Sequence, residues 1–343
     1  MCALDGLAAA LQSVVGEEFL RTAPVTAEYT IDGVTPAMVV LPADEEQTAA
    51  TLRLANEHRA TVFPRGGGSH MALGNPPARV DVVLSLQRLQ GHLAYEPADM
   101  TTTVQAGLRL ADLQQTLGDH GQFLALDPPA AMTTTLGGIV AANRSGPRRF
   151  LYGSARDLLL GLAVITMDGK RTKAGGRVVK NVSGYDLNKL YIGSLGTLAV
   201  IVELTFKLHP IPPGEHTVGI GFTHQADMLP LLQTVIQLPL RLNSLTLLNA
   251  AASTALAAPA TLPMPDTTYL LMARLEGTSQ ITRNQEQRLA AALQNLSLQG
   301  TATVQTWHDD TPVRLWRGIE EFPVAMQTAS PGSVLSKVSL RLS

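Results

Sequence analysis

Short apolar runs alternate with amphipathic segments in the first part of the chain, and this pattern predicts an α/β arrangement. Ala37–Leu41 is a strand, and the acidic run Asp44–Glu46 opens a helix, because carboxylates suit the positive end of the helix dipole. Thr61–Phe63 is a second strand. The order predicts a β-α-β unit, and the segment that follows residue 63 then lies at the carboxyl end of a strand, where open α/β sheets commonly bind ligands.

The same hydrophobic pattern predicts further helices and strands, up to the proline-rich stretch at residues 209–213. A helix over residues 4–20 precedes the first strand, and a helix over 109–119 ends before Gly121. The other predicted strands are 80–86, 101–106, 123–126, 158–167, 171–174 and a long strand that ends near 208. Asp168-Gly169 is a hairpin signal. His209–Pro213 is interpreted as a linker between two domains.

The second part of the chain follows another order. Predicted strands are 218–222, 244–249, 269–275 and 302–307, and predicted helices are 226–237 and 281–296. The resulting order β-α-β-β-α-β is the split βαβ, or ferredoxin-like, pattern. A helix over 312–322 and a strand over 334–342 follow. Because the sequence stops within a strand, we expect this domain to be incomplete.

Residues 63–77 are the most distinctive stretch, with Gly66-Gly67-Gly68 directly after Arg65. Three glycines allow a sharp backbone turn, and their N–H groups can converge on an anion such as a pyrophosphate. The Rossmann fingerprint is excluded because Met71 stands where its third glycine is needed, and no P-loop spacing occurs. A plain surface turn is the alternative.

Two later stretches share this glycine-rich character. Thr133–Gly146 has threonines followed by small residues, which suits the start of a helix thin enough to lie against a flat ligand. Close packing of that helix is the alternative for its glycines. Gly193–Ile201 carries a Gly-Ser-x-Gly-Thr turn that leads directly into a strand.

Composition excludes several functional classes. The 26 basic and 28 acidic residues give a net charge of −2, and aromatic residues make up 4%, so a nucleic-acid surface is not expected. Cys2 is the single cysteine, which excludes an internal disulfide and a cysteine-held cluster or zinc site within these residues. The chain shows no basic leader and no apolar run near the ~18 residues of a membrane helix, so a cytoplasmic protein is expected.

Together the three glycine-rich stretches resemble the FAD-binding domain of the vanillyl-alcohol oxidase/p-cresol methylhydroxylase (PCMH) family, over residues 33–211. Arg65–Gly74 resembles that family's pyrophosphate loop, Leu136–Gly146 its segment beside the flavin, and Gly193–Ile201 its Gly-Ser-x-Gly-Thr strand. Within the family, two segments look most like the FAD-binding subunits of glycolate oxidases. These segments are Asn143–Arg149 and Lys180–Leu187.

The resemblance implies an α+β fold with a two-subdomain PCMH-type FAD-binding domain. We expect a helical extension over 1–32, the FAD-binding domain over 33–211 and the ferredoxin-like cap over 212–343. It also implies an FAD-dependent oxidoreductase that takes a hydride from a 2-hydroxy acid to flavin N5. The implied partners are a larger flavoprotein subunit and an iron–sulfur subunit that receives the electrons, in the cytoplasm or at the inner face of the membrane. The alternatives are a self-sufficient D-lactate or 2-hydroxy-acid dehydrogenase and a non-catalytic scaffold subunit.

The resemblance further implies the residues of the site. Expected FAD-binding residues are Arg65, Gly66, Gly67, Gly68, Ser69, His70, Gly74, Asn75, Pro76, Pro128, Thr135, Gly137, Gly138, Asn143, Gly146, Gly196, Thr197 and Ile201. Arg148 and Arg149 are the candidates for holding a substrate carboxylate. Non-covalent FAD is expected, with a covalent bond to His70 as the alternative. Leu195 departs from the Glu that catalytic relatives often carry.

The cap supplies three histidines, His216, His224 and His308, at spacings that do not resemble those of metal ligands along the chain. The sequence reading therefore predicts no metal site. Each of these histidines is expected at the surface or bonded to a neighbouring side chain.

Overall fold

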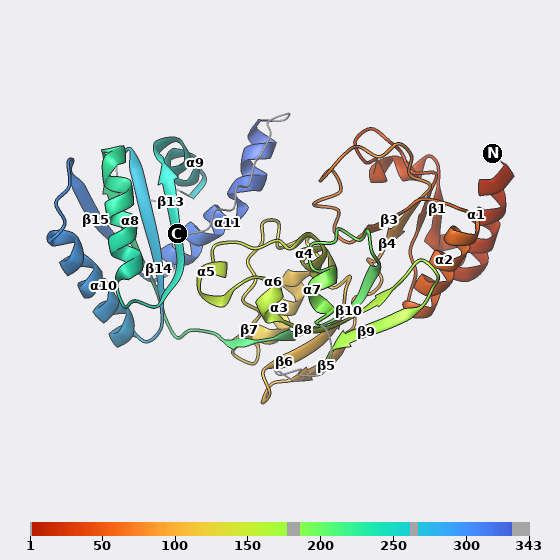
Figure 1. Cartoon of the computed structure of the whole chain (residues 1–343), viewed down its shortest axis with the longest axis horizontal. Helices are drawn as coiled ribbons and strands as arrows, with labels where there is room; N and C mark the ends of the chain where they lie inside the picture. The colour runs from red at the N-terminus through yellow and green to blue at the C-terminus, as the bar shows by residue number, and fades with distance from the viewer. Residues whose placement is uncertain (1, 177–185, 261–266, 331–343) are drawn as a thin grey trace. The chain divides into compact units, whose positions relative to one another are not determined.

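The computed structural model describes residues 2–176, 186–260 and 267–330, and it divides into two compact units (Figure 1). Unit 1 comprises Met1–Ala125, Ala130–Arg144 and Ser154–Pro210. Unit 2 comprises Leu126–Pro129, Ser145–Gly153 and Ile211–Ser343. Two short segments from the middle of the sequence therefore pack with the C-terminal part of the chain.

The first sheet of unit 1 has the strand order β1-β2-β4-β3 and is parallel except for β1. Its strands are β1 (Leu20–Thr22), β2 (Met38–Val40), β3 (Val62–Arg65) and β4 (Val82–Ser85). Helix α2 (Glu45–Glu57) begins at Asp44, whose Oδ1 accepts a hydrogen bond of 2.8 Å from Gln47 N. The predicted β-α-β unit is confirmed, and β4 lies between its two strands.

The second sheet of unit 1 is antiparallel, in the order β5-β6-β10-β8-β9. Its strands are β5 (His92–Glu96), β6 (Thr101–Gln105), β8 (Leu159–Ile165), β9 (Arg171–Gly175) and β10 (Val200–Lys207). The other elements of unit 1 are α1 (Cys2–Val15), α3 (Leu110–Gly118), α4 (Leu136–Ala142), α6 (Ala155–Leu158), α7 (Asn188–Tyr191), β7 (Gln122–Phe123), β11 (His209–Pro210) and the 3-10 helices η1 (Glu17–Phe19) and η2 (Val25–Tyr29). The central strand β10 is buried along almost its whole length, as its run of β-branched and aromatic residues indicates.

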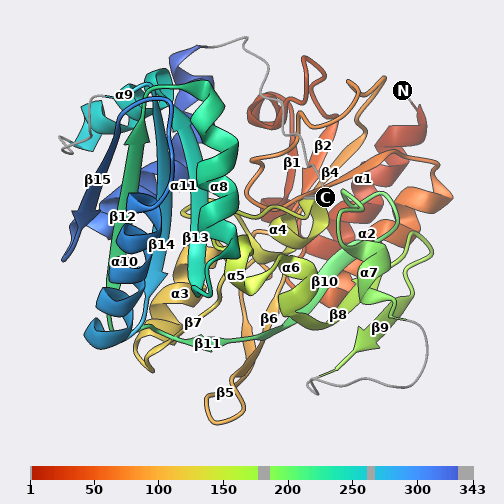
Figure 2. The same ribbon diagram turned by 60° about the vertical axis from the view of Figure 1, so that its left-hand side comes forward.

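Unit 2 contains one antiparallel sheet in the order β13-β14-β12-β15 (Figure 2). Its strands are β12 (Glu215–Phe222), β13 (Leu242–Asn249), β14 (Tyr269–Glu276) and β15 (Ala302–Trp307). Its helices are α5 (Arg149–Tyr152), α8 (Met228–Gln237), α9 (Ala250–Ala260), α10 (Ser279–Gln294) and α11 (Thr311–Ala329), with the 3-10 helix η3 (Gln225–Asp227). This is the predicted ferredoxin-like arrangement, with α9 and α11 added.

Helices cover both faces of the sheet of unit 2, and strand β12 makes contacts on each face. Val218, Ile220 and Phe222 form a core with the helices α8 and α10. On the opposite face, Thr217 Oγ1 accepts a hydrogen bond of 2.8 Å from Nε1 of the fully buried Trp316 of α11. Within the described ranges, no helix combines the length and apolarity needed to cross a membrane.

Several sequence expectations differ from the structure at element ends. The helix predicted over 4–20 ends at Val15, and the chain then forms β1 (Leu20–Thr22), which pairs with β2. The segment predicted as a linker begins with β11, which pairs with β7, the short strand that replaces the one predicted over 123–126. Strand β5 and helix α9 were not predicted. The strand predicted over 334–342 lies outside the described residues.

Gly107 gives a stability test for unit 1. A Cβ added there would lie 1.9 Å from the carbonyl oxygen of Leu86 and 2.7 Å from that of Leu89, so backbone would have to move. We expect Gly107→Ala to lower the free energy of unfolding by about 1–3 kcal/mol, the usual cost of overpacking. Urea unfolding followed by circular dichroism measures the change.

Gly118→Ala is the matched control, because Gly118 ends α3 and a Cβ there meets nothing within 4 Å. This variant should be neutral or slightly stabilising, as alanine is favoured in helices. Equal stability of the two variants would contradict the packing that the structure shows around Gly107.

Candidate functional site

A groove in unit 1 gathers residues from the glycine-rich stretches. Its walls come from the end of β3 and the loop after it, from the residues before and within α4, and from the turn that precedes β10. The residues that line it are Pro64, Arg65, Gly66, Leu86, Ala106, Thr135, Gly137, Gly138, Ala141, Leu195, Gly196, Ala199, Val200 and Ile201. Of the residues expected at the site, the groove is lined by Arg65, Gly66, Thr135, Gly137, Gly138, Gly196 and Ile201.

The glycine loop lies directly against residues 133–135, and only glycine allows this contact. A Cβ added to Gly66 would lie 2.0 Å from Thr135 Oγ1, and one added to Gly67 would lie 1.9 Å from the carbonyl oxygen of Thr133. Within the described part of the chain, the backbone N–H groups of residues 66–69 donate to no protein acceptor. The loop therefore offers a run of free donors beside the end of a strand, as an anion-binding nest requires.

Arg65 places a positive charge at the start of this loop. Its guanidinium lies over the ring of Tyr29, 4.4 Å from the ring centroid. Among the described residues, its Nε is a buried donor without an acceptor. A buried unsatisfied donor costs free energy unless a ligand or water supplies an acceptor. This atom and the free loop amides fit a bound phosphate group.

The start of α4 makes little contribution to anion binding, because its first amides are already used. Leu136 N donates to Leu108 O over 2.9 Å, and Gly137 N donates to Ala106 O over 2.8 Å. Gly138 N donates to the N-cap hydroxyl of Thr135 over 3.3 Å. The free backbone donors of this region therefore belong to the glycine loop and not to the start of this short helix.

The absence of a side chain has a different structural consequence at each of the two glycines of α4. A Cβ at Gly137 would lie 2.8 Å from Ala106 Cβ, so this residue allows close packing of α4, which was the alternative reading of the sequence. A Cβ at Gly138 would meet only Thr135 Oγ1, at 3.2 Å. Gly138 lines the groove, so its missing side chain leaves room for a ligand.

The turn before β10 is bonded to the end of α4 and forms another wall. Gly193 N and Leu195 N donate to the carbonyl oxygens of Val140 and Ala141, over 3.0 and 2.9 Å. Leu195 has φ 54° and an exposed side chain in the groove lining, although leucine rarely adopts this backbone conformation. The position where relatives often carry Glu is thus apolar and faces the groove.

His70 lies in the glycine loop beside polar groups. Its Nδ1 is 2.9 Å from Ser69 Oγ. Burial and, secondarily, the charge of Arg144 lower the pKa of His70 below its ordinary value. The imidazole is therefore neutral at pH 7, which leaves a ring nitrogen that can accept a hydrogen bond.

Other expected site residues of unit 1 do not line the groove. Gly74, Asn75 and Pro76 are exposed residues further along the loop. Asn143 ends α4 in the left-handed conformation, and Thr197 Oγ1 donates to Ser194 O over 2.7 Å. The sequence reading did not select Pro64, Ala141 or Ala199, because single small apolar residues carry no chemical signal.

The remaining expected residues lie in unit 2, around a buried carboxyl group. Asp127 accepts hydrogen bonds from Gly146 N over 3.0 Å and from Arg148 N over 2.8 Å. A Cβ at Gly146 would lie 1.9 Å from the carbonyl oxygen of Asp127, so this glycine permits the contact. Pro128 follows Asp127 in the same segment. Burial raises the pKa of Asp127 to about 6, although both N–H groups and the Arg148 charge oppose the shift.

Arg148 is held within unit 2 by Glu276. Its Nη2 lies 3.2 Å from Glu276 Oε1, and the Glu276 side chain is 2% exposed. The second oxygen of Glu276 accepts hydrogen bonds from Tyr152 OH, over 3.1 Å, and Asn243 Nδ2, over 2.5 Å. Arg149, by contrast, is exposed. Arg148, one of the two arginines predicted to bind a substrate carboxylate, is therefore already paired with a buried carboxylate of the protein.

A second arginine, Arg274, joins the same buried group of charges. Its guanidinium lies 2.6 Å from Glu215 Oε2, 3.2 Å from Glu276 Oε1 and 3.8 Å from Glu320 Oε1. With Asp127 included, four carboxyl groups surround two guanidinium groups. Desolvation, with the neighbouring Asp127 adding to it, raises the pKa of Glu320 to about 7. Protons on Glu320 and Asp127 therefore leave two negative carboxylates to balance the two guanidinium groups.

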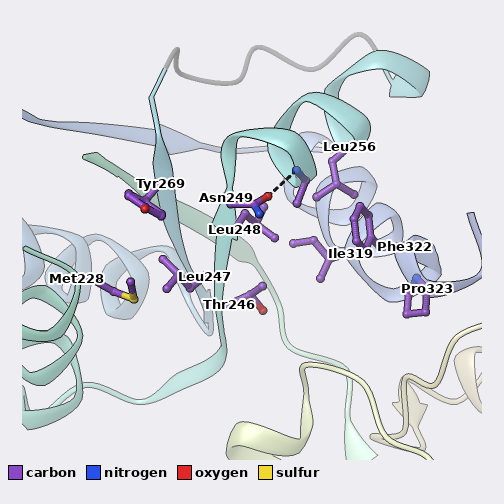
Figure 3. Close-up of a pocket in the computed structure, with 11 residues that line it drawn as sticks. Met228, Thr246, Leu247, Leu248, Asn249, Leu256, Tyr269, Ile319, Phe322 and Pro323 are labelled. Atoms are coloured by element: carbon purple, nitrogen blue, oxygen red, sulfur yellow. Dashed lines mark hydrogen bonds between the residues drawn. The ribbon is translucent and has the colours of Figure 1, made fainter. Parts of the chain in front are cut away.

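Unit 2 also has an apolar hollow between β13, α9 and α11 (Figure 3). Its lining includes Leu248, Leu256, Ile319 and Phe322. The Asn249 side chain at its rim accepts a hydrogen bond of 2.9 Å from Ala252 N at the start of α9. Apart from the phenol of Tyr269, its lining contains no ionisable side chain, so the hollow offers no carboxylate, histidine or charged anchor.

The comparisons with known proteins identify the glycine-rich region. Residues 36–175 match the family model of the FAD binding domain. The glycolate oxidase subunit GlcD of Bacillus subtilis is 33% identical over 183 residues, which cover 53% of this chain and 39% of the relative. The D-lactate dehydrogenase of Archaeoglobus fulgidus is 36% identical over 193 residues, which cover 56% and 43%. A D-2-hydroxyglutarate dehydrogenase of Xanthomonas citri is 37% identical over 178 residues, which cover 52% and 38%.

The chain spans about two fifths of the length of these curated relatives. Among solved structures, p-cresol methylhydroxylase with substrate bound has a TM-score of 0.79 at 16% identity, over 95% of this chain and 72% of that one. The 4-ethylphenol oxidase from Gulosibacter chungangensis has a TM-score of 0.75 at 17% identity, over 96% and 72%. These structures show the fold alone. They confirm the expected PCMH-type fold, and the domain match confirms FAD as the expected cofactor.

The shifted carboxyl groups predict how the stability of unit 2 depends on pH. Because the pKa of Glu320 is raised from 4.5 to about 7, the folded state holds this proton more tightly than the unfolded state. The free energy of unfolding therefore falls as pH rises from 5 to 8. We expect Glu320→Gln to reduce this fall by about 2 kcal/mol, since an amide does not ionise.

Urea unfolding at pH 5, 6, 7 and 8 measures the difference between Glu320→Gln and the unaltered chain. Using the difference removes the contribution of other titrating groups that both proteins share. Parallel stability curves for the two proteins would contradict a raised pKa for Glu320.

Proposed function

We propose that this chain is the FAD-carrying subunit of a glycolate or 2-hydroxy-acid oxidising complex, in which residues 36–175, the region that matches the FAD binding domain, carry the cofactor. The observation that carries the proposal is the similarity of this domain to a glycolate oxidase subunit and to two 2-hydroxy-acid dehydrogenases. The groove in unit 1 supports it, because its walls come from the same three stretches that suggested a flavin site.

In this proposal the glycine loop binds the pyrophosphate of FAD. The N–H groups of residues 66–69 donate to the phosphate oxygens, and Arg65 Nε gains the acceptor that it lacks within the described chain. Hydrogen bonds to a charged acceptor are stronger than those between neutral groups, so several converging donors provide much of the binding free energy. The amides at the start of α4 are excluded from this role because they are already bonded.

Gly138 and Gly196 present backbone, without side chains, to the rest of the cofactor. A Cβ at Gly196 would lie 3.1 Å from Pro64 Cγ, so this residue also lets the turn approach the end of β3. When bound, FAD supplies the hydride acceptor for oxidation of the carbon that carries the substrate hydroxyl. The chain's own residues bind and orient the cofactor and exclude water from the groove.

The substrate carboxylate needs a cation, and Arg149 is the better of the two predicted candidates. Arg148 is paired with the buried Glu276, and breaking a buried ion pair is costly. Arg149 has an exposed side chain and can meet a small anion. A planar guanidinium suits bidentate binding of a carboxylate.

The proposed partners are an iron–sulfur subunit that accepts electrons and a larger flavoprotein subunit. The segment Asn143–Arg149, which resembles glycolate oxidase subunits, supports this part of the proposal. The other such segment, Lys180–Leu187, lies largely outside the described residues, which leave out 177–185. The flavin is held without a covalent bond. Yellow colour that remains in an acid-precipitated pellet would instead indicate attachment through His70.

Gly138→Ala tests the flavin groove separately from the fold. Its new Cβ would meet only Thr135 Oγ1 within the protein, yet it projects into the groove lining. We expect FAD binding to weaken at least tenfold, which is about 1.4 kcal/mol, with little change in the melting temperature of the FAD-free protein. Titration of FAD fluorescence measures the affinity.

Two variants control this experiment. Gly67→Ala should lose both stability and FAD affinity, because its Cβ displaces the loop from Thr133. Gly118→Ala should retain both. FAD affinity unchanged in Gly138→Ala would argue against the groove as the flavin site.

Anaerobic reduction separates the proposed subunit from its alternatives. We expect the purified, FAD-loaded chain to show little or no bleaching of its flavin with glycolate or D-lactate, because turnover needs the partner subunits. Full bleaching by the isolated chain would support a self-sufficient dehydrogenase instead. A colourless protein that FAD does not stabilise against heating would support a scaffold subunit.

A further inference from the structure

The register of the sheet in unit 2 places two histidines opposite each other. Strands β12 and β15 are antiparallel, and the last pair of their ladder is Thr217 with Trp307. One step further along the same register, His216 lies opposite His308, as neighbours across an antiparallel pair do. Their ring centroids are 4.3 Å apart in an edge-to-face arrangement. Residues at the first and the last strand of the unit 2 sheet therefore form one cluster.

Helix α10 adds a carboxylate to this pair. Side chains two residues apart on a strand lie on the same face, so His216 lies on the face of Val218, Ile220 and Phe222. Those three residues pack against α8 and α10, so His216 lies on the face that α10 covers. Glu286 is one turn after the buried Thr282 on α10. Glu286 Oε1 lies 2.5 Å from His216 Nδ1 and 4.0 Å from His308 Nδ1.

These distances allow a metal ion with small side-chain movements. One ligand atom from each of His216, Glu286 and His308 lies within 4.8 Å of the other two. Zinc–ligand distances of ~2.0–2.1 Å in a tetrahedron separate ligand atoms by roughly 3.3 Å. The His216–Glu286 contact would open by about 0.8 Å, and His308, whose side chain is 47% exposed, would move inward.

The surroundings favour a cation at this point. His216 and Glu286 are 16% and 18% exposed, so their ligand atoms are partly shielded from water, while His308 leaves one side open. Thr282 Oγ1 lies 3.5 Å from His216 Nε2, on the side of the ring away from Glu286. Such a partner turns Nδ1 toward the proposed ion, as outer-shell groups do in metal sites. Asp309 and Asp310 follow His308 and add negative charge nearby.

We propose that His216, Glu286 and His308 bind a divalent transition-metal ion, with Zn²⁺ as the best match. Two imidazoles and one carboxylate, with water in the fourth position, are a known zinc ligand set. The ion would take the place of the direct contact between His216 and Glu286. It would join α10 to the end of the β12–β15 pair. This site is separate from the flavin groove and does not depend on the proposed function. The sequence alone predicted no metal site, and the proposed site departs from that expectation, which considered only spacing along the chain.

Equilibrium dialysis of the full chain against Zn²⁺, with metal content measured by mass spectrometry, tests this site. We expect one equivalent of bound Zn²⁺ and a rise in the melting temperature with Zn²⁺ concentration. Binding should weaken as the pH is lowered, since protons compete with the metal for its ligand atoms. His216→Ala, His308→Ala and Glu286→Gln should each weaken binding at least tenfold.

His224→Ala is the matched control, because His224 is an exposed histidine of the same unit outside the cluster. It should retain the full stoichiometry and affinity. Melting curves without metal show whether each variant is folded, and the conservative Glu286→Gln keeps the side-chain volume. No bound Zn²⁺ in the unaltered chain, or equal loss of Zn²⁺ in His224→Ala and the cluster variants, would overturn the proposal.

Discussion

The contact between the glycine loop and residues 133–135 is the constraint on which the groove of unit 1 depends. With any side chain on Gly66 or Gly67, the loop would have to move away by an ångström or more, because an added Cβ would lie about 2 Å from atoms of Thr133 or Thr135. The contact brings the end of β3 beside α4. Within the described residues it also leaves the loop amides without protein acceptors, so these donors stay available to a ligand.

In unit 2 the corresponding constraint is electrostatic. Two guanidinium groups and four carboxyl groups are mostly removed from water, and removal of charges from water is costly unless they are paired. Asp127 and Arg148 come from the two short middle segments and are bonded to each other, and the ion pair of Arg148 with Glu276 joins these segments to the cap. The segment Asn143–Arg149, which looked like one motif in the sequence, thus passes from one unit to the other after Arg144.

The features that local sequence predicted well are those whose cause is local. The acidic start of α2, the β-α-β order and the hairpin at Asp168-Gly169 each depend on neighbours within a few residues, and the structure confirms them. The alternation of strands and helices was also enough to predict the ferredoxin-like cap. Strand β5 was missed because its side chains are mostly exposed, and α9 because an alanine-rich segment lacks an apolar stripe.

The histidine cluster and the buried charges were beyond local prediction for a different reason. Nothing near His216 in the sequence indicates His308, since only the register of β12 with β15 makes them neighbours. A slip of β12 by one residue would turn His216, together with Val218, Ile220 and Phe222, to the face where Thr217 and Trp316 now pair. The apolar core on the α10 face and the Trp316 hydrogen bond on the other face both oppose such a shift. The packing that stabilises the cap therefore also determines which side chains meet in the histidine cluster.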